Sequence, residues 1–352
     1  MKIAVVGAGQ WGMALAQTLS MNPGTRIALW ARSPALAGSL IATRRNATHL
    51  PDIVLSEDVA VSDELAFVLQ GSDIAILAVP THGMREIAER CRPLLDRCAV
   101  VSAAKGFERD SGLTMTAILA MVLGAEAPIA ALSGPNIATE IARGLPAAAV
   151  VASADDRIAC FVRDGCTGAQ LRMYSSNDVI GVEYGGALKN VIAIAAGIGD
   201  GMHAGDNGKA AIMTRGLAEM ARLGGAAGAN PLTFAGLTGV GDCFVTCMSP
   251  YSRNRRLGER IGEGATVAEA AATTVMVTEG VNAAAAAQQL AQRANIEMPL
   301  VDQVCAILFE GKPVRTALAD LMRRGARAEL AELGLSPGGE HPAGLGPPAG
   351  AC

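Results

Sequence analysis

The fold is decided by the stretch KIAVVGAGQWGMALAQTLS at residues 2–20. Its apolar, strand-like start runs into GAGQWG at residues 7–12, and a segment of helical period follows directly. This is the pattern GxGxxG between a strand and a helix, in which glycines allow a tight turn and bring a pyrophosphate close to the amides that open the helix. The motif predicts a dinucleotide-binding turn. Its expected contacts are Gly7, Gly9, Gln10, Trp11 and Gly12.

The order of segments predicts an α/β fold with two domains. The first half alternates apolar β-runs with helix-period segments, which is typical of βαβ units and a mostly parallel sheet covered on both faces. We expect strands at 2–6, 26–30, 73–79, 99–103, 129–133, 147–152 and 170–174. Helix-period stretches such as 282–295 and 299–308 follow. We therefore expect a doubly wound Rossmann-type domain at 1–180, an all-helical substrate and catalytic domain at 181–335, and a disordered Gly/Pro-rich tail at 336–352.

Composition limits the classes of function. A chain of 352 residues is long enough for two domains, and a net charge of −4 with a pI near 5.7 gives no support for a basic surface that binds nucleic acid. Its eight cysteines form no CxxC pair, so we expect a reducing cytoplasm and no metal site. Glycines interrupt the N-terminal apolar run, which argues against a signal peptide, and the apolar stretch 184–199 is too short for membrane insertion.

Arg32 bears on the choice between the two nicotinamide cofactors. It ends the second expected strand, 20 residues past Gly12, where an NAD-preferring protein places an acid for the ribose 2′-hydroxyl. An arginine there suits the 2′-phosphate of NADPH. The sequence therefore favours NADPH and allows NADH, and the alternative is a solvated arginine without a ligand.

Two lysines are candidates for roles in ligand binding or catalysis. Lys105 follows the strand expected at 99–103, at the carboxyl edge where such sheets bind ligands. Lys189 is the only charged residue between Glu183 and Asp200, so a buried helix there would desolvate its ammonium group. Such a lysine is a candidate proton donor. The alternative is a lysine whose stem packs on apolar surface while its head reaches water.

Three further segments supply groups suited to a small phosphorylated substrate. SGPNIATEIARGLP places Gly134 and Asn136 at a strand-to-helix turn, where amides meet anions. LTGVGDCFVTC places Asp242 in a glycine-rich turn. SRNRR, residues 252–256, gathers side chains that can donate hydrogen bonds to a phosphate. For this segment alone, the alternative is a charged surface.

Nine segments carry a resemblance when taken in order. They are GAGQWGMALA, the LWAR strand end, NATHLP, AAKGF, SGPNIATEIARGLP, GVEYGGALKNVIAIAAGIGDGMHAGDNGKAAIMTRGLAEM, GLTGVGDCFVTC, SRNRRLGE and VTEGV. Over about residues 1–335 the chain resembles the NAD(P)-dependent glycerol-3-phosphate dehydrogenases of bacterial type. The resemblance is specific because no single motif carries it.

The resemblance implies a reaction and a set of residues. The reaction is the reversible reduction of dihydroxyacetone phosphate to sn-glycerol 3-phosphate for phospholipid synthesis, by a cytoplasmic enzyme that is usually a homodimer. Lys189 would be the general acid/base. Implied substrate contacts are Lys105, Gly134, Asn136, Lys189, Asp242, Ser252, Arg253 and Asn254. Implied cofactor contacts are Trp11, Arg32, Lys105, Ala138, Arg253, Val277 and Glu279.

The chain departs from the family pattern at a few positions. Gln10 and Met13 stand where the family more often has Ser or Asn and Thr, and His49 replaces the usual Tyr before Leu-Pro. Asn136 stands where Ser or Thr is usual. These departures affect the fine contacts at positions 10 and 136 and not the proton chemistry.

Two other functions fit parts of the sequence. A β-hydroxyacid or ketopantoate reductase also pairs a Rossmann domain with a catalytic lysine in a helical domain, but it binds a carboxylate, and SRNRR fits a phosphate better. A redox-sensing regulator would bind NAD(P) without turnover. Loss of Lys189 or Asp242 would have favoured the regulator, and both residues are present.

Overall fold

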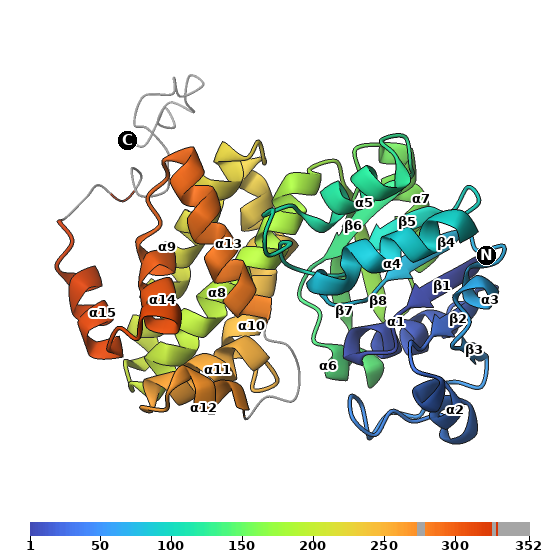
Figure 1. Ribbon diagram of the computed structural model, residues 1–352, viewed down its shortest axis with the longest axis horizontal. Coiled ribbons are helices and arrows are strands. Elements are labelled where there is room, and N and C mark those ends of the chain that lie inside the picture. The colour runs from blue at the N-terminus through green and yellow to red at the C-terminus, as the bar shows by residue number, and fades with distance from the viewer. Residues whose placement is uncertain (273–278, 326–328, 330–352) are drawn as a thin grey trace, which may run out of the picture.

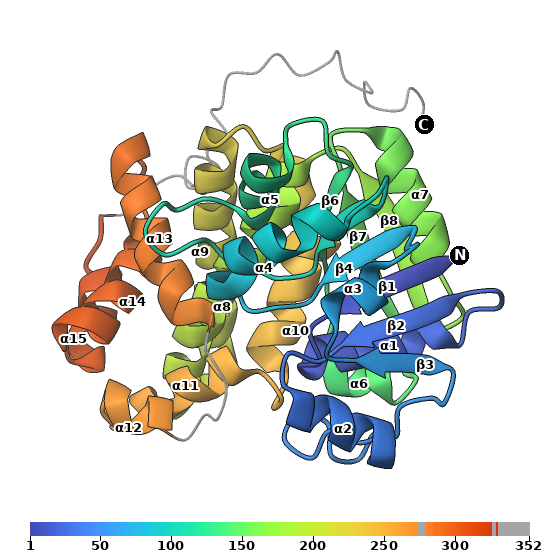
Figure 2. The same ribbon diagram turned by 45° about the vertical axis from the view of Figure 1, so that its right-hand side comes forward.

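The computed structural model describes residues 1–272, 279–325 and 329. Val277 and the tail at 336–352 lie outside the described residues. Figures 1 and 2 show two lobes side by side, a sheet flanked by helices and a bundle of helices.

An eight-stranded sheet forms the first lobe, in the order β3-β2-β1-β4-β5-β6-β7-β8. Its strands are β1 (Lys2–Val6), β2 (Arg26–Trp30), β3 (Val59–Ser62), β4 (Ile74–Leu77), β5 (Ala99–Ser102), β6 (Ile129–Ser133), β7 (Ala147–Ala152) and β8 (Leu171–Ser176). Each pair from β3 to β6 is parallel, β6 and β7 are antiparallel, and β7 and β8 are parallel to each other. The mostly parallel sheet is as expected, and the reversal of its last two strands is new.

All seven expected strands are present, with ends shifted by a few residues at three of them. The sequence analysis missed β3, the edge strand. It has four residues, and only Val59 among them is buried. So short and half-exposed a strand lacks the long apolar run by which buried parallel strands are recognised.

Helices cover both faces of the sheet, as a doubly wound fold requires. One face packs against α1 (Gln10–Ser20), α2 (Pro34–Thr43), α6 (Ala138–Ala142) and α7 (Asp156–Cys166). The other packs against α3 (Leu65–Leu69), α4 (Met84–Cys91) and α5 (Met115–Leu123). The two apolar layers hold the carboxyl ends of β1, β4 and β5 at one edge, where the connecting turns leave the sheet.

The second lobe is helical throughout its described residues. Its elements are α8 (Val179–Gly201), α9 (Gly205–Ala226), η3 (Pro231–Ala235), η4 (Leu237–Gly241), α10 (Asp242–Met248), α11 (Arg253–Gly262), α12 (Val267–Ala272), α13 (Glu279–Ala294), α14 (Pro299–Glu310) and α15 (Val314–Met322). The helices expected at 282–295 and 299–308 are α13 and α14. Helix α8 lies at the centre of this lobe (Figure 1) and contributes a third apolar core with α9 to α14.

Helix α8 is long and apolar enough to cross a membrane, but 83% of its most apolar window is buried inside the protein. That is the position of a core helix. It packs closely on α11, because a Cβ on Gly197 would lie 2.0 Å from the Arg255 carbonyl oxygen and one on Gly258 would lie 2.0 Å from that of Ile194. The close approach places the first residues of α11 beside Lys189.

Candidate active site

The glycine-rich turn between β1 and α1 has the shape of a pyrophosphate cradle. Gly7 has a φ of 117°, which favours glycine, and a Cβ on Gly12 would lie 1.8 Å from the Gly7 carbonyl oxygen. At Gly9 a Cβ would meet nothing within 4 Å, so the turn is open on that side. Gly9 is the N-cap of α1 and supplies no side-chain hydrogen bond to its first amides.

Two neighbouring groups complete this cradle. The Trp11 Nε1 is buried and has no hydrogen-bond partner among the described residues. The Asn46 amide nitrogen donates to the Ala8 carbonyl oxygen at 2.9 Å and fixes the following loop against the turn. Burial lowers the pKa of His49 on this loop, and the charge of Arg253 from the helical lobe lowers it further. The open amides and the unpartnered donor fit an anionic dinucleotide.

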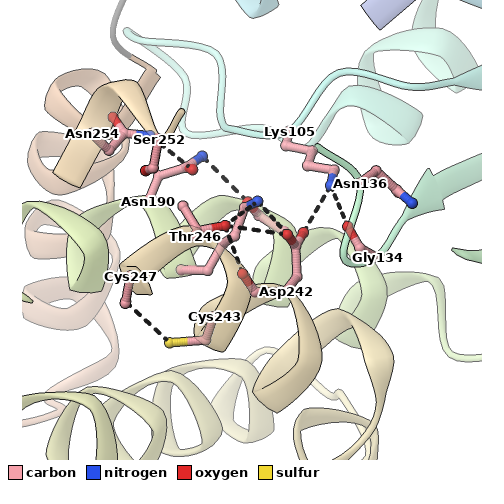
Figure 3. A network of polar contacts seen from close by, with 12 residues as sticks. Lys105, Gly134, Asn136, Asn190, Asp242, Cys243, Thr246, Cys247, Ser252 and Asn254 are labelled. Carbon is pink, nitrogen blue, oxygen red and sulfur yellow. Dashed lines mark hydrogen bonds and ion pairs between the residues drawn. The ribbon is translucent and has the colours of Figure 1, made fainter. Parts of the chain in front are cut away.

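Asp242 joins two lysines from the two lobes. Its side chain is fully buried, and it accepts from Lys189 Nζ at 2.5 Å and from Lys105 Nζ at 2.7 Å, on different carboxylate oxygens. Lys189 Nζ also donates to Thr246 Oγ1 at 2.9 Å. Figure 3 shows this network, with Lys105 and Thr246 on opposite sides of the Asp242 carboxylate. The buried ammonium of Lys189 is therefore held by two acceptors. The alternative, in which the head of this lysine reaches water, is wrong.

Lys105 is the residue that the sheet lobe contributes to this network. It follows β5, and its Nζ donates to the Gly134 carbonyl oxygen at 2.8 Å as well as to Asp242. Burial lowers the pKa of Lys105 to about 8; the charge of Lys189 lowers it too, and the negative charge of Asp242 opposes the shift. A lysine with this pKa changes its charge near physiological pH.

Close backbone packing sets the position of Asp242. The π-helical turn η4 leads directly into α10, and a Cβ on Gly239 would lie 1.9 Å from the Phe234 carbonyl oxygen. On α8, a Cβ on Gly185 would lie 2.7 Å from the Thr238 carbonyl oxygen. Gly239 thus lets the chain before Asp242 turn tightly, and Gly185 lets this turn lie directly against the helix that carries Lys189.

The first residues of α11 lie next to this centre. The Asn254 amide nitrogen donates to Asn190 Oδ1 at 2.9 Å, and its Oδ1 accepts from the Gly280 amide at 3.0 Å. Ser252 is buried and caps the helix, because its Oγ accepts from the Arg255 amide at 3.3 Å. Burial lowers the pKa of Arg253, and the charge of Glu279 opposes this shift. A guanidinium, an amide and a helix N-terminus therefore meet at one place.

Glu279 connects this place to the sheet. Its carboxylate accepts from Thr81 Oγ1 at 2.7 Å, and Thr81 begins η1 (Thr81–Gly83), the first element after β4. Gly106 is adjacent, because a Cβ there would lie 3.6 Å from Glu279 Oε2. Glu279 therefore lies at the carboxyl edge of the sheet, on the side of the Lys105 turn.

Not every predicted residue joins the network. The Asn136 amide nitrogen donates to the Ala148 carbonyl oxygen at 3.1 Å, and Figure 3 shows the side chain turned away from Lys105 and Asp242. Ala138 begins α6 and packs against the sheet core. Arg32 is exposed, two residues after the end of β2.

Sequence reasoning gave no role to three residues that organise the site. Thr246 accepts a hydrogen bond from Lys189, Asn190 orients Asn254, and Thr81 holds Glu279. The signal for Asn190 was its place directly after Lys189 in a buried apolar helix. Thr81 carried no local signal, because its partner lies 198 residues away.

A dinucleotide cradle on a Rossmann-type sheet, facing a buried pair of lysines that share one carboxylate, defines a nicotinamide-dependent oxidoreductase. Sequence profiles then supply the family. The profile "NAD-dependent glycerol-3-phosphate dehydrogenase N-terminus" matches residues 2–159, and the corresponding C-terminus profile matches residues 178–319. The chain belongs to the NAD-dependent glycerol-3-phosphate dehydrogenase family.

Individual relatives agree with this membership. Glycerol-3-phosphate dehydrogenase [NAD(P)+] of Moorella thermoacetica is 45% identical over 329 residues, which cover 93% of this chain and 97% of the relative. The solved structure of glycerol-3-phosphate dehydrogenase from Coxiella burnetii is 36% identical, with a TM-score of 0.87 over 92% of this chain and 99% of that chain. A ketopantoate reductase from Ralstonia eutropha is 17% identical with a TM-score of 0.55, over 92% of this chain and 100% of that chain, and shares the fold alone.

Proposed function

We propose that this chain reduces dihydroxyacetone phosphate to sn-glycerol 3-phosphate with NADPH or NADH, reversibly, and so supplies a precursor of glycerophospholipids. The observation that carries the proposal is the buried cluster of Lys105, Lys189 and Asp242 between the glycine turn and the N-terminus of α11. The names of the curated relatives support the choice of substrate.

Lys189 is proposed as the general acid/base. When bound, the nicotinamide supplies hydride to the ketone carbon, and negative charge develops on the carbonyl oxygen. The Lys189 ammonium has three N–H donors, and Asp242 and Thr246 take two of them. The third would face the substrate oxygen, stabilise its charge and donate the proton. Thr246 Oγ1 donates to the Asp242 backbone oxygen at 2.6 Å, so its lone pair is oriented toward Lys189.

The remaining residues would hold the substrate in register with the cofactor. Arg253, Asn254 and the N-terminus of α11, capped by Ser252, would bind the phosphate. Lys105 would place a second positive charge beside the ketone, next to the carbonyl of Gly134. Asn136 is retained as a substrate contact through its Oδ1, which is buried without a partner among the described residues. This positioning converts binding energy into correct geometry for hydride transfer.

The cofactor would lie along the carboxyl edge of the sheet. The glycine turn with Gln10 and Trp11 would hold the pyrophosphate, as its open amides suggest. Toward the nicotinamide we place Lys105, Ala138, Arg253, Val277 and Glu279, of which Val277 lies outside the described residues. Arg32 would contact the 2′-phosphate of NADPH and favour it over NADH.

The setting of the enzyme is also a proposal. We place it in the cytoplasm, as a homodimer, with residues 1–180 for the dinucleotide and 181–335 for the substrate and catalysis. The cysteines among the described residues, most of them buried, are free thiols, which agrees with a reducing compartment. Sedimentation or mass photometry of the purified chain would test the dimer.

A substrate comparison tests the proposed function. We expect NADPH oxidation with dihydroxyacetone phosphate, little with dihydroxyacetone, which lacks the phosphate, and little with ketopantoate. Preference for ketopantoate would instead support the keto-acid reductase. NADPH binding without oxidation of the cofactor by any of the three would support a redox-sensing regulator.

A further inference from the structure

An acidic residue on α4 faces the proposed 2′-phosphate contact. Arg32, which follows β2 by two residues, approaches Glu86 with its Nη2 3.6 Å from Glu86 Oε1. Glu86 lies in the first turn of α4, on the helix layer next to the end of β2. Both side chains are exposed, at 71% and 53%, so a bound cofactor can reach them.

A second arginine holds Glu86 in this position. Arg90, one helical turn later, places its Nη1 3.8 Å from the same carboxylate oxygen. Its guanidinium lies over the Trp30 ring at 5.1 Å from the centroid, a cation–π contact. The indole itself is fixed, because Trp30 Nε1 donates to the Asp63 carbonyl oxygen at 2.8 Å. Glu86 therefore has a second cationic neighbour, Arg90, that remains when Arg32 turns to another anion.

We propose that Glu86 is a specificity-determining residue that reduces the preference for NADPH by competing for Arg32 and repelling the 2′-phosphate. This inference rests on the proposed function, because it needs Arg32 at the 2′ position. NADH leaves the pair of Arg32 and Glu86 intact. NADPH must displace Glu86 from Arg32 and place a phosphate near its carboxylate, which then retains only Arg90.

The size of this effect follows from the exposure of the pair. Exposed ion pairs contribute little, and the range measured for them corresponds to about a 1.5-fold to fivefold change in a binding constant. Repulsion between Glu86 and the phosphate acts in the same direction. We therefore expect Glu86→Gln to tighten NADP⁺ binding about twofold to fivefold and to change NAD⁺ binding less than about 1.5-fold. Added salt should reduce the difference, because exposed charges are screened.

Calorimetric dissociation constants of NADP⁺ and NAD⁺ test the inference without turnover. The matched control is Glu89→Gln, which removes the same charge from an exposed position on α4 that faces Arg85. We expect the control to leave both constants unchanged. In an Arg32→Ala background, Glu86→Gln should tighten NADP⁺ by a smaller factor, because only the repulsion remains.

The outcomes separate this inference from the proposed function. If Arg32→Ala weakens NADP⁺ selectively but Glu86→Gln changes both cofactors equally, or weakens NADP⁺, the role of Glu86 is wrong and Arg32 keeps its place. If Arg32→Ala changes NADP⁺ and NAD⁺ by the same factor, the 2′-phosphate contact itself is wrong. Selective tightening of NADP⁺ by Glu86→Gln alone, with Glu89→Gln silent, supports the proposal.

Discussion

Replacing Asp242 by Asn probes the centre of the proposed mechanism while changing the volume of the side chain very little. Asp242 is fully buried and accepts from two lysines, at 2.5 and 2.7 Å. Asn offers one oxygen, so its amide N–H groups must face one of the ammonium groups. Removing one partner of a buried ion pair costs about 3 to 5 kcal/mol, because the remaining charge stays buried and uncompensated.

Part of that cost would appear as lost catalysis, because Lys189 loses the acceptor that orients it. We expect turnover with dihydroxyacetone phosphate to fall by about 10²- to 10⁴-fold, the range for a misplaced general acid. Steady-state kinetics measures this, and thermal unfolding and NADPH fluorescence titration show whether fold and cofactor binding survive. Asp206→Asn, at an exposed site on α9, is the control and should behave as wild type. A folded Asp242→Asn enzyme that keeps more than about a tenth of wild-type turnover would refute the reasoning.

Three further predictions concern charge. Because the pKa of Lys105 is about 8, its positive charge is present below that pH and lost above it; the KM for dihydroxyacetone phosphate should therefore rise above pH 8, and Lys105→Met should flatten this part of the pH profile. Arg253→Ala should raise the KM about 10- to 100-fold with a smaller change in NADPH affinity, since a charged hydrogen bond is worth about 1.5 to 3 kcal/mol; an unchanged KM places the phosphate elsewhere. Burial raises the pKa of Glu219 to about 7, above its usual 4.5, so the folded state binds the extra proton and the free energy of unfolding should fall as pH rises from 4.5 through 7. Glu219 accepts from the Leu300 and Val301 amides, and Glu219→Gln should remove this slope in chemical denaturation; an equal slope in the variant assigns it to another group.

The parts of the fold that follow from local pattern could be predicted from the sequence. The turn at Gly7 to Gly12 is specified by residues that only this geometry requires, and the burial of Lys189 follows from a helix that is apolar on every side. The reversed direction of β7 and β8 could not be predicted. β7 is an apolar run and β8 alternates buried with exposed residues, and neither pattern depends on the direction of the strand.

The sequence indicates which residues come together at the candidate site, but not the contacts among them. Lys105, Lys189, Asp242 and Asn254 do converge, but the sequence does not show that one carboxylate bridges both lysines. That arrangement depends on how the two lobes pack. The direction of the Asn136 amide has the same origin, since its acceptor belongs to the neighbouring strand β7.

The most direct test of the account is Lys189→Ala, with turnover and cofactor affinity measured on the same protein. The account predicts that NADPH oxidation with dihydroxyacetone phosphate falls at least about 10²-fold, because the proton donor is lost. The NADPH dissociation constant should stay near wild type, because the glycine turn and Arg32 lie away from Lys189. Turnover above about a tenth of wild type, in a folded variant that binds NADPH normally, would contradict the assignment of Lys189 as the general acid.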